Sequence, residues 1–141
     1  MEINAENMLF DRLNALVKAS SDKKIIIRNV LGQRYIASGA ENKEILIYGV
    51  AGNALGAYLS NTLVKVYGNA QDAAGDTMNS GSITVFGHAG DTIGYAMRGG
   101  TIMVEGDAGF RVGIHMKEYG SHVPKIIIGG KAGDFLGEYQ A

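Results

Sequence analysis

Three histidines are the side chains of this 141-residue chain with the most evident capacity for chemistry. Imidazole serves in acid–base catalysis and in metal binding, and the three residues are His88, His115 and His122. Their spacing is not that of a zinc site. Neither a serine nor a carboxylate pair is fixed beside one of them in a pattern typical of nucleophilic or acid–base catalysis. We therefore predict that the chain holds no catalytic, cofactor-binding or metal-binding residues.

The sulfur-containing residues lead to the same prediction. The chain has no cysteine, which excludes disulfides, thiolate zinc sites, cysteine-ligated iron–sulfur clusters and a cysteine nucleophile. Met78, Met97 and Met116 recur every 19 residues. A stripe of thioether metal ligands would show this spacing, but methionine is more often the residue that fills irregular gaps in a core. We interpret these three methionines as a column inside the protein.

A third group of side chains is polar and lies in the central and last parts of the chain. Polar side chains in stacked turns either satisfy backbone groups between neighbouring turns or form an interface for another protein. Under the second interpretation the candidate interface residues are Asp72, Asn79, Arg98, Arg111, His115 and Lys117.

Glycine marks the elements that must position these residues. Gly49, Gly68, Gly87 and Gly106 are each 19 residues apart, and around them the pattern Gly-x-Ala-Gly-x-x-x-Gly follows a short apolar run. The pattern returns at Gly130 after 24 residues, which indicates an insertion near residues 116–125. A fixed period near 20 is typical of a solenoid, in which one turn cannot bury its apolar face alone.

Aligning the copies places apolar side chains in equivalent positions of successive turns. The alternation within each apolar run predicts strands with two stacked inward columns. These two columns are Ile25, Ile45, Val64, Ile83, Ile102, Ile126 and Ile27, Ile47, Val66, Val85, Val104, Ile128. After an alanine corner, two more inward columns are Leu55, Ala74, Ile93, Val112, Leu136 and Leu59, Met78, Met97, Met116. The sequence therefore predicts an all-β fold, a parallel β-helix of about six coils.

The first 24 residues lack this repeat. Between Ala5 and Ser20, Leu9, Leu13 and Val17 recur at the spacing of an amphipathic helix. We expect residues 1–24 to form an N-terminal helical cap or arm, and residues 25–141 to form the β-helix domain.

The charge balance bears on partners and location. Thirteen basic and fourteen acidic side chains leave a net charge of −1, without the basic excess that nucleic acids or acidic membranes require. No apolar run is long enough to span a membrane, and the N-terminus does not resemble a secretion signal. We expect a cytoplasmic protein that binds neither nucleic acid nor a membrane.

Several runs of sequence are more specific than the repeat. They read GNAQDAAGDTMNSG at 68–81, GYAMRGG at 94–100, RVGIHMKEYG at 111–120 and GDFLGEY at 133–139. In these runs the chain resembles the GXGXG domain of glutamate synthase, the C-terminal β-helix of its large subunit. The resemblance is closest to the archaeal-type version, in which that domain is a separate small polypeptide. A weaker similarity extends to the formylmethanofuran dehydrogenase component that shares the repeat.

The resemblance implies a single-stranded, right-handed parallel β-helix without chemistry of its own. Glutamate synthase converts 2-oxoglutarate and glutamine to two glutamates, and this domain packs against the catalytic parts. The chain is then expected to be a structural scaffold subunit, not catalytic alone, that organises the glutaminase and the FMN-containing synthase. FMN and the iron–sulfur cluster are expected only in these partner subunits. The family usually continues beyond the position of Tyr139–Ala141. We therefore expect the last coil to expose an edge that a partner subunit or a second copy covers.

Two other functions stay open. The weaker similarity points to a structural component of a formylmethanofuran dehydrogenase-like complex. A β-helix can also bind a ligand by itself, in a groove on the outside of its coils. Ligand-binding β-helices of this kind usually cluster charged residues on one sheet. The outward positions here are mostly apolar, namely Leu46, Lys65, Thr84, Met103 and Ile127.

Overall fold

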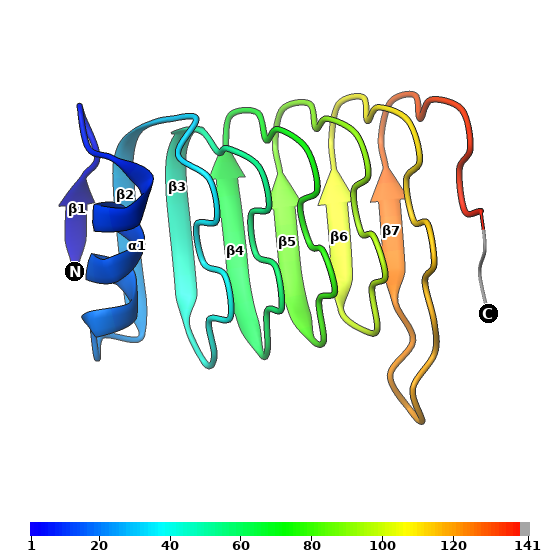
Figure 1. The fold of residues 1–141 in the computed structure, drawn as a ribbon, viewed down its shortest axis with the longest axis horizontal. Coiled ribbons are helices and arrows are strands. Elements are labelled where there is room, and N and C mark those ends of the chain that lie inside the picture. Colours follow the sequence, from blue (N-terminus) through cyan, green and yellow to red (C-terminus); the bar gives the residue numbers. More distant parts are fainter. Residues whose placement is uncertain (139–141) are drawn as a thin grey trace.

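The strands of this protein all run in one direction. A computed structural model describes residues 1–138. Its elements are β1 (Glu2–Asn4), α1 (Phe10–Ala19), β2 (Lys24–Leu31), β3 (Glu44–Val50), β4 (Thr62–Tyr67), β5 (Gly81–Val85), β6 (Thr101–Val104) and β7 (Lys125–Ile128). The strands pair in chain order in one parallel sheet, and after each strand the chain returns away from the sheet (Figure 1). The predicted parallel β-solenoid is confirmed.

The register of the sheet follows the 19-residue period. Each inward residue lies opposite its equivalent in the next strand, in the order Ile25, Ile45, Val64, Ile83, Ile102 and Ile126 for the first column. Both strand columns are fully buried from β2 to β6. Because β-branched residues pack well on a pleated surface, these columns form the centre of the core. The positions between them are half-buried or exposed in most strands, although Leu46 is only 9% exposed.

Within residues 1–138 the solenoid has about four turns, which join β3 to β4, β4 to β5, β5 to β6 and β6 to β7, the last with the insertion. The repeat count predicts about six coils, and the two outer copies account for the difference. The pairing of β2 with β3 shifts in register between Ile27 and Val30. After β7, no further strand follows in the part of the chain that the structure describes. The predicted edge at Tyr139–Ala141 lies outside the described residues.

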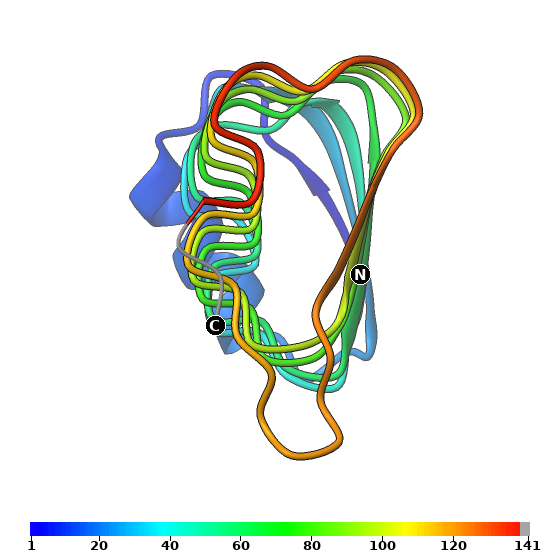
Figure 2. The ribbon, with the colours of Figure 1, turned by 90° about the vertical axis from the view of Figure 1, so that its right-hand side faces the viewer.

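The segment between each corner and the next strand, here called the return segment, is also bonded from coil to coil. In residues 53–60 the Ala54 N–H donates to the Asp72 carbonyl of the following coil, at 2.9 Å. The Gly56 N–H donates to the Ile36 carbonyl of the preceding coil, also at 2.9 Å. Ala54 and Gly56 both have positive φ, 60° and 64°. The end-on view shows the return segments stacked opposite the sheet (Figure 2).

Side chains of the return segments complete the core. Met78 and Met97 are fully buried and Met116 is partly buried, so the methionine column is part of the core as predicted. Leu136, which was predicted to point inward, is 62% exposed. Its equivalent Leu55 is fully buried because another coil lies on each side of it.

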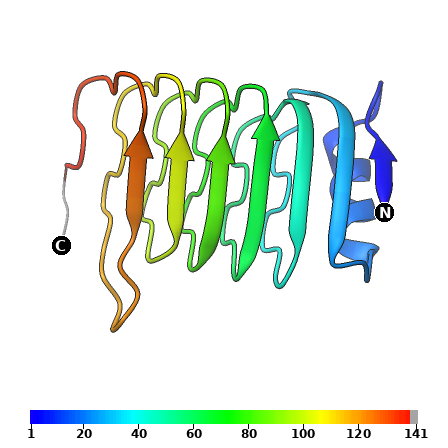
Figure 3. The same cartoon turned by 180° about the vertical axis from the view of Figure 1, so that it is seen from behind.

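The N-terminal segment is less helical than predicted. Residues Glu2–Asn4 form β1, which pairs with β2 at the end of the sheet (Figure 3). The helix α1 begins at Phe10 and not at Ala5, because the Ala5 N–H still donates to the Arg28 carbonyl and Asn7 has a positive φ of 57°. Leu13 and Val17 of α1 are buried in the core cluster. α1 thus covers the first coil on the side where later coils have their return segments (Figure 2).

Candidate functional site

The corners after β3, β4, β5 and β6 are stabilised by side chains that accept backbone hydrogen bonds from the next coil. The Asn53 side chain accepts the N–H of Asp72 at 2.9 Å, and the Asp72 carboxylate accepts the N–H of Asp91 at 2.8 Å. The Asp91 carboxylate accepts the N–H of Phe110 at 2.8 Å. Asp72, a predicted interface residue, thus satisfies backbone groups between coils.

His88 has the same role in a second column. The Asn69 side chain accepts the N–H of His88 at 2.8 Å, and His88 Nδ1 accepts the N–H of Asp107 at 2.7 Å. The Asp107 carboxylate in turn accepts the N–H of Lys131 at 2.8 Å. Sequence reasoning did not find this role of His88. The signal for it was the 19-residue spacing from two residues, Asn69 and Asp107, that also carry acceptors.

These two capping columns explain the glycines of the repeat. A Cβ atom at Gly106 would overlap His88 Nδ1, and one at Gly109 would overlap the Asp91 carboxylate. The motif Gly-x-Ala-Gly therefore leaves space for the capping side chains of the preceding coil.

Three of the predicted interface residues lie in one column at the far end of the return segments. Asn79, Arg98 and Lys117 are 19 residues apart, and the Lys117 N–H donates to the carbonyl of Met97 in the preceding coil. Arg98 and Lys117 are exposed. The guanidinium of Arg98 lies 5.2 Å from the ring centroid of Tyr119, and Lys117 Nζ lies 5.8 Å from it. Both cations therefore contact the same aromatic ring.

Tyr119 belongs to the insertion, which projects from the stack as an insertion hairpin of residues 118–124 (Figure 2). Tyr119 and His122 exchange two backbone hydrogen bonds, at 3.0 and 2.9 Å. Gly120 makes the turn between them with φ 61°. Tyr119 and Val123 are 43% and 45% exposed. Arg98, Lys117, Tyr119, His122 and Val123 together define what we call the hairpin surface.

The other two candidate residues lie along the same coil. His115 is two residues before Lys117, and its ring contacts that of Tyr95 edge-on at 5.5 Å. Arg111 is at the start of the return segment, with its guanidinium 4.8 Å from the ring centroid of Phe135. The structure thus brings Asn79, Arg98, His115 and Lys117 to one end of the return segments. It places Arg111 and Asp72 towards the other end.

An aromatic stack follows the strands on the outside of the sheet. The rings of Tyr48 and Tyr67 are stacked at 4.7 Å, and those of Tyr67 and Phe86 at 5.0 Å. The Arg28 guanidinium lies 4.7 Å from the Tyr48 ring centroid and extends the stack by one coil. Tyr67 and Phe86 stay 40% and 39% exposed.

The three histidines lie in three different places, namely a corner, a return segment and the insertion hairpin. Among residues 1–138, no three His, Asp or Glu side chains are grouped so that they could hold a metal ion. Within the same residues, no helix has both the length and the apolar character needed to cross a bilayer.

Comparison with known proteins gives one family match and one similar protein. The family profile described as GXGXG motif matches residues 19–141. An uncharacterized protein of Methanocaldococcus jannaschii is 49% identical over 146 aligned residues, which cover 99% of this chain and 56% of that protein. The chain therefore spans little more than half the length of this relative. The comparison with solved structures gave no significant match.

Proposed function

Because the chain belongs to the GXGXG motif family, we propose that it is a non-catalytic scaffold subunit of a glutamate synthase. In this proposal a right-handed β-helix, covered at one end by an amphipathic helix, holds the glutaminase and the FMN-containing synthase in register. FMN and the iron–sulfur cluster belong to those partner subunits, and the assembly works in the cytoplasm.

The observation that carries the proposal is the insertion hairpin. Ile102 pairs with Ile126 in the register of the other strands, so the sheet continues across the insertion without using its extra residues. The hairpin is thus not needed for the stack. It nevertheless adds an exposed tyrosine to two exposed cations, and tyrosine and arginine are enriched where proteins bind each other. We propose that the hairpin surface docks an acidic region of a catalytic partner.

The proposal is tested by reconstitution from purified parts. The chain is mixed with the glutaminase and the FMN-containing synthase of the same organism, and complexes are measured by sedimentation velocity. We expect a stable complex, and a loss of affinity of about tenfold or more for the double variant Arg98→Glu/Lys117→Glu. The matched control is Lys65→Glu, which reverses a charge on the outside of the sheet and should bind normally. A chain that binds neither partner contradicts the proposal. Binding to a component of formylmethanofuran dehydrogenase instead supports the alternative.

We also propose that the C-terminal coil takes part in assembly. A hollow of about 470 Å³ is lined there by apolar residues that include Ile126, Ile128 and Leu136. In the described residues β7 pairs only with β6, which leaves one edge of β7 available. Sedimentation of the chain alone tests whether a second copy covers this end. A dimer that the variant Leu136→Lys dissociates supports a second copy, and a monomer excludes one; loss of affinity of Leu136→Lys in the reconstitution above then supports a catalytic partner.

A further inference from the structure

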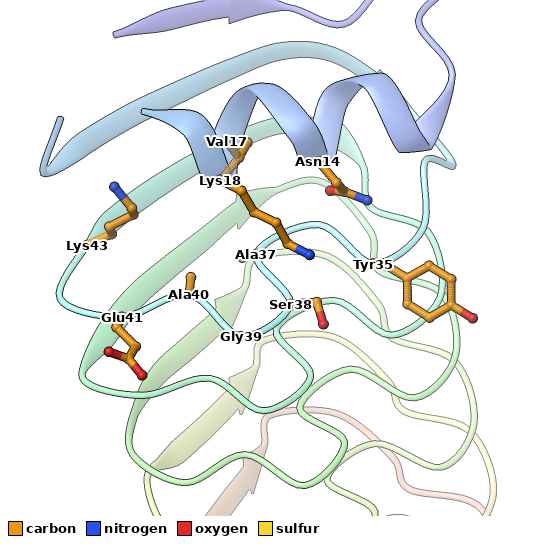
Figure 4. Close-up of a pocket in the computed structure, with 10 residues that line it drawn as sticks. All are labelled: Asn14, Val17, Lys18, Tyr35, Ala37, Ser38, Gly39, Ala40, Glu41 and Lys43. Atoms are coloured by element: carbon orange, nitrogen blue, oxygen red, sulfur yellow. The ribbon is translucent and has the colours of Figure 1, made fainter. Parts of the chain in front are cut away.

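A groove lies between α1 and the first return segment, where α1 covers the first coil (Figure 4). It has a volume of about 430 Å³, which is in the range of sites for small molecules. One wall is formed by α1, with Asn14 and Lys18, and the other by residues 35–43. The groove is at the opposite end of the solenoid from β7, so it is separate from the hairpin surface.

Small residues keep the groove open. Its floor includes Ala37 and Ala40, and Gly39 adds no side chain to the space. A Cβ atom built at Gly39 would meet no atom within 4 Å. Leu13 and Val17 hold α1 in place because both are buried in the core cluster. The two walls are therefore fixed by packing, while the space between them stays free.

Asn14 lines this groove and carries an unsatisfied acceptor. Its Nδ2 donates to the Arg34 carbonyl at 2.9 Å, which fixes the orientation of the amide. Its Oδ1 is buried and has no hydrogen-bond partner. A buried acceptor without a partner is destabilising, and few native groups are left in this state. A ligand with an N–H or O–H donor could satisfy the Oδ1 atom.

The groove also has one available charge of each sign. Lys18 is on the α1 wall and Glu41 is on the opposite wall, as Figure 4 shows. Both are exposed, and neither forms an ion pair within the described residues. Lys43, in contrast, is engaged, because its Nζ donates to the carbonyls of Ser20 and Asp22 at 2.8 and 2.9 Å. The groove therefore offers a bound molecule one unpaired cation and one unpaired anion.

We propose that this groove binds a free amino acid with an amide, amine or guanidinium group in its side chain. Lys18 binds the carboxylate, Glu41 binds the ammonium group, and Asn14 Oδ1 accepts a hydrogen bond from the side-chain N–H. Lys18 is exposed and forms no ion pair within the described residues, so its side chain is available to reorient toward a bound carboxylate. The proposal does not depend on the scaffold function, since it uses none of the residues of the hairpin surface.

The test is a titration of the full chain, followed in ¹H–¹⁵N correlation spectra, with glutamine, asparagine, lysine and arginine. Succinate and putrescine serve as comparison ligands, because each carries charges of only one sign. We expect at least one of the four amino acids to bind with a Kd of about 1 mM or below and to shift amides of residues 14–18 and 35–41. Succinate and putrescine should bind at least tenfold more weakly. The proposal is overturned if none of the four amino acids binds at about 10 mM, or if the shifts lie elsewhere.

Charge variants identify the contacts. Lys18→Glu and Glu41→Lys should each weaken binding about tenfold or more, and the double exchange should restore part of the affinity because a zwitterion can bind reversed. Lys23→Glu is the matched control and should leave the Kd unchanged. All variants are exposed substitutions, so their spectra should keep the dispersion of the folded chain. Single variants that bind like the unaltered chain contradict the assignment of the groove.

Discussion

At the scale of single residues, the corners are determined by acceptors that repeat every 19 positions. Asn53, Asp72 and Asp91 form one capping column, and Asn69, His88 and Asp107 form the other. Asparagine, aspartate and histidine share a single property here, since each presents an acceptor to the backbone N–H of the next coil. This explains why a position that varies in residue type still has a constant function.

Asp91 provides a direct test of the capping columns. Asp91→Ala removes the acceptor for the Phe110 N–H, and it should lower the free energy of unfolding by about 1 kcal/mol. Asp91→Asn keeps an oxygen acceptor, as Asn53 does in the same column. Its free energy of unfolding should therefore stay within a few tenths of a kcal/mol of that of the unaltered chain. Urea unfolding measures both. Equal stabilities for the alanine and asparagine variants would show that the hydrogen bond contributes nothing.

At the scale of elements, the strands and the methionine column could be predicted from the sequence. The repeat is short, so each position of a coil occurs several times in the chain and its apolar or polar character can be compared between copies. Individual ends were not predictable in this way. The three residues of β1 carry no repeat of their own, and they join the sheet only because β2 offers a free edge. α1 begins only at Phe10, after Ala5 has bonded to the Arg28 carbonyl and Asn7 has turned the chain with a positive φ of 57°. The groove beside α1 was equally hidden, since it depends on where the helix lies against the first coil.

The same limit applies to the candidate interface. Spacing alone places Asn79, Arg98 and Lys117 in one column. It does not reveal that Tyr119 folds over two of them, because the insertion has no equivalent in other coils. Asp72 was grouped with these residues by polarity, although its contacts are those of a corner cap.

The methionine column makes a prediction about stability. Met97 is fully buried, whereas Met103 is 39% exposed on the outside of the sheet. Met97→Ala should destabilise the protein by about 2–5 kcal/mol, because it leaves a cavity in the core. Met103→Ala should cost about 0.5 kcal/mol or less. Chemical unfolding compares the two variants, and similar losses for both would contradict a core role for the column.

The insertion hairpin makes a prediction about function. Replacing residues 118–124 by two glycines, as at Gly99 and Gly100, restores the 19-residue spacing of the other turns. The free energy of unfolding of this variant should lie within about 1 kcal/mol of that of the unaltered chain, because the sheet register does not use the hairpin. Its affinity for the catalytic partners should fall by about tenfold or more. Unchanged affinity at unchanged stability would remove the hairpin from the interface.

At the scale of the whole molecule, each coil is stabilised mainly by its neighbours, so stability should decrease towards an uncovered end. The N–H groups of Phe86, Glu105 and Gly129 make equivalent bonds, to Val66, Val85 and Val104, at 3.0, 2.9 and 2.7 Å. Gly129 lies between Ile128 and Gly130, two of the residues that line the apolar hollow at the C-terminal end of the stack. In the monomer its hydrogen-exchange protection factor should be at least about tenfold lower than that of Phe86. Equal protection would mean that the stack unfolds as a single unit.

The scaffold role concerns the whole molecule and is tested most directly by enzyme turnover. The rate of glutamine-dependent glutamate formation from 2-oxoglutarate is measured for the glutaminase and the FMN-containing synthase, with and without this chain. The chain alone should form no glutamate, and its addition should raise the rate of the two partners until the three are present in the ratio of the complex. Turnover by the isolated chain, or a partner rate that does not respond to it, would contradict a scaffold role.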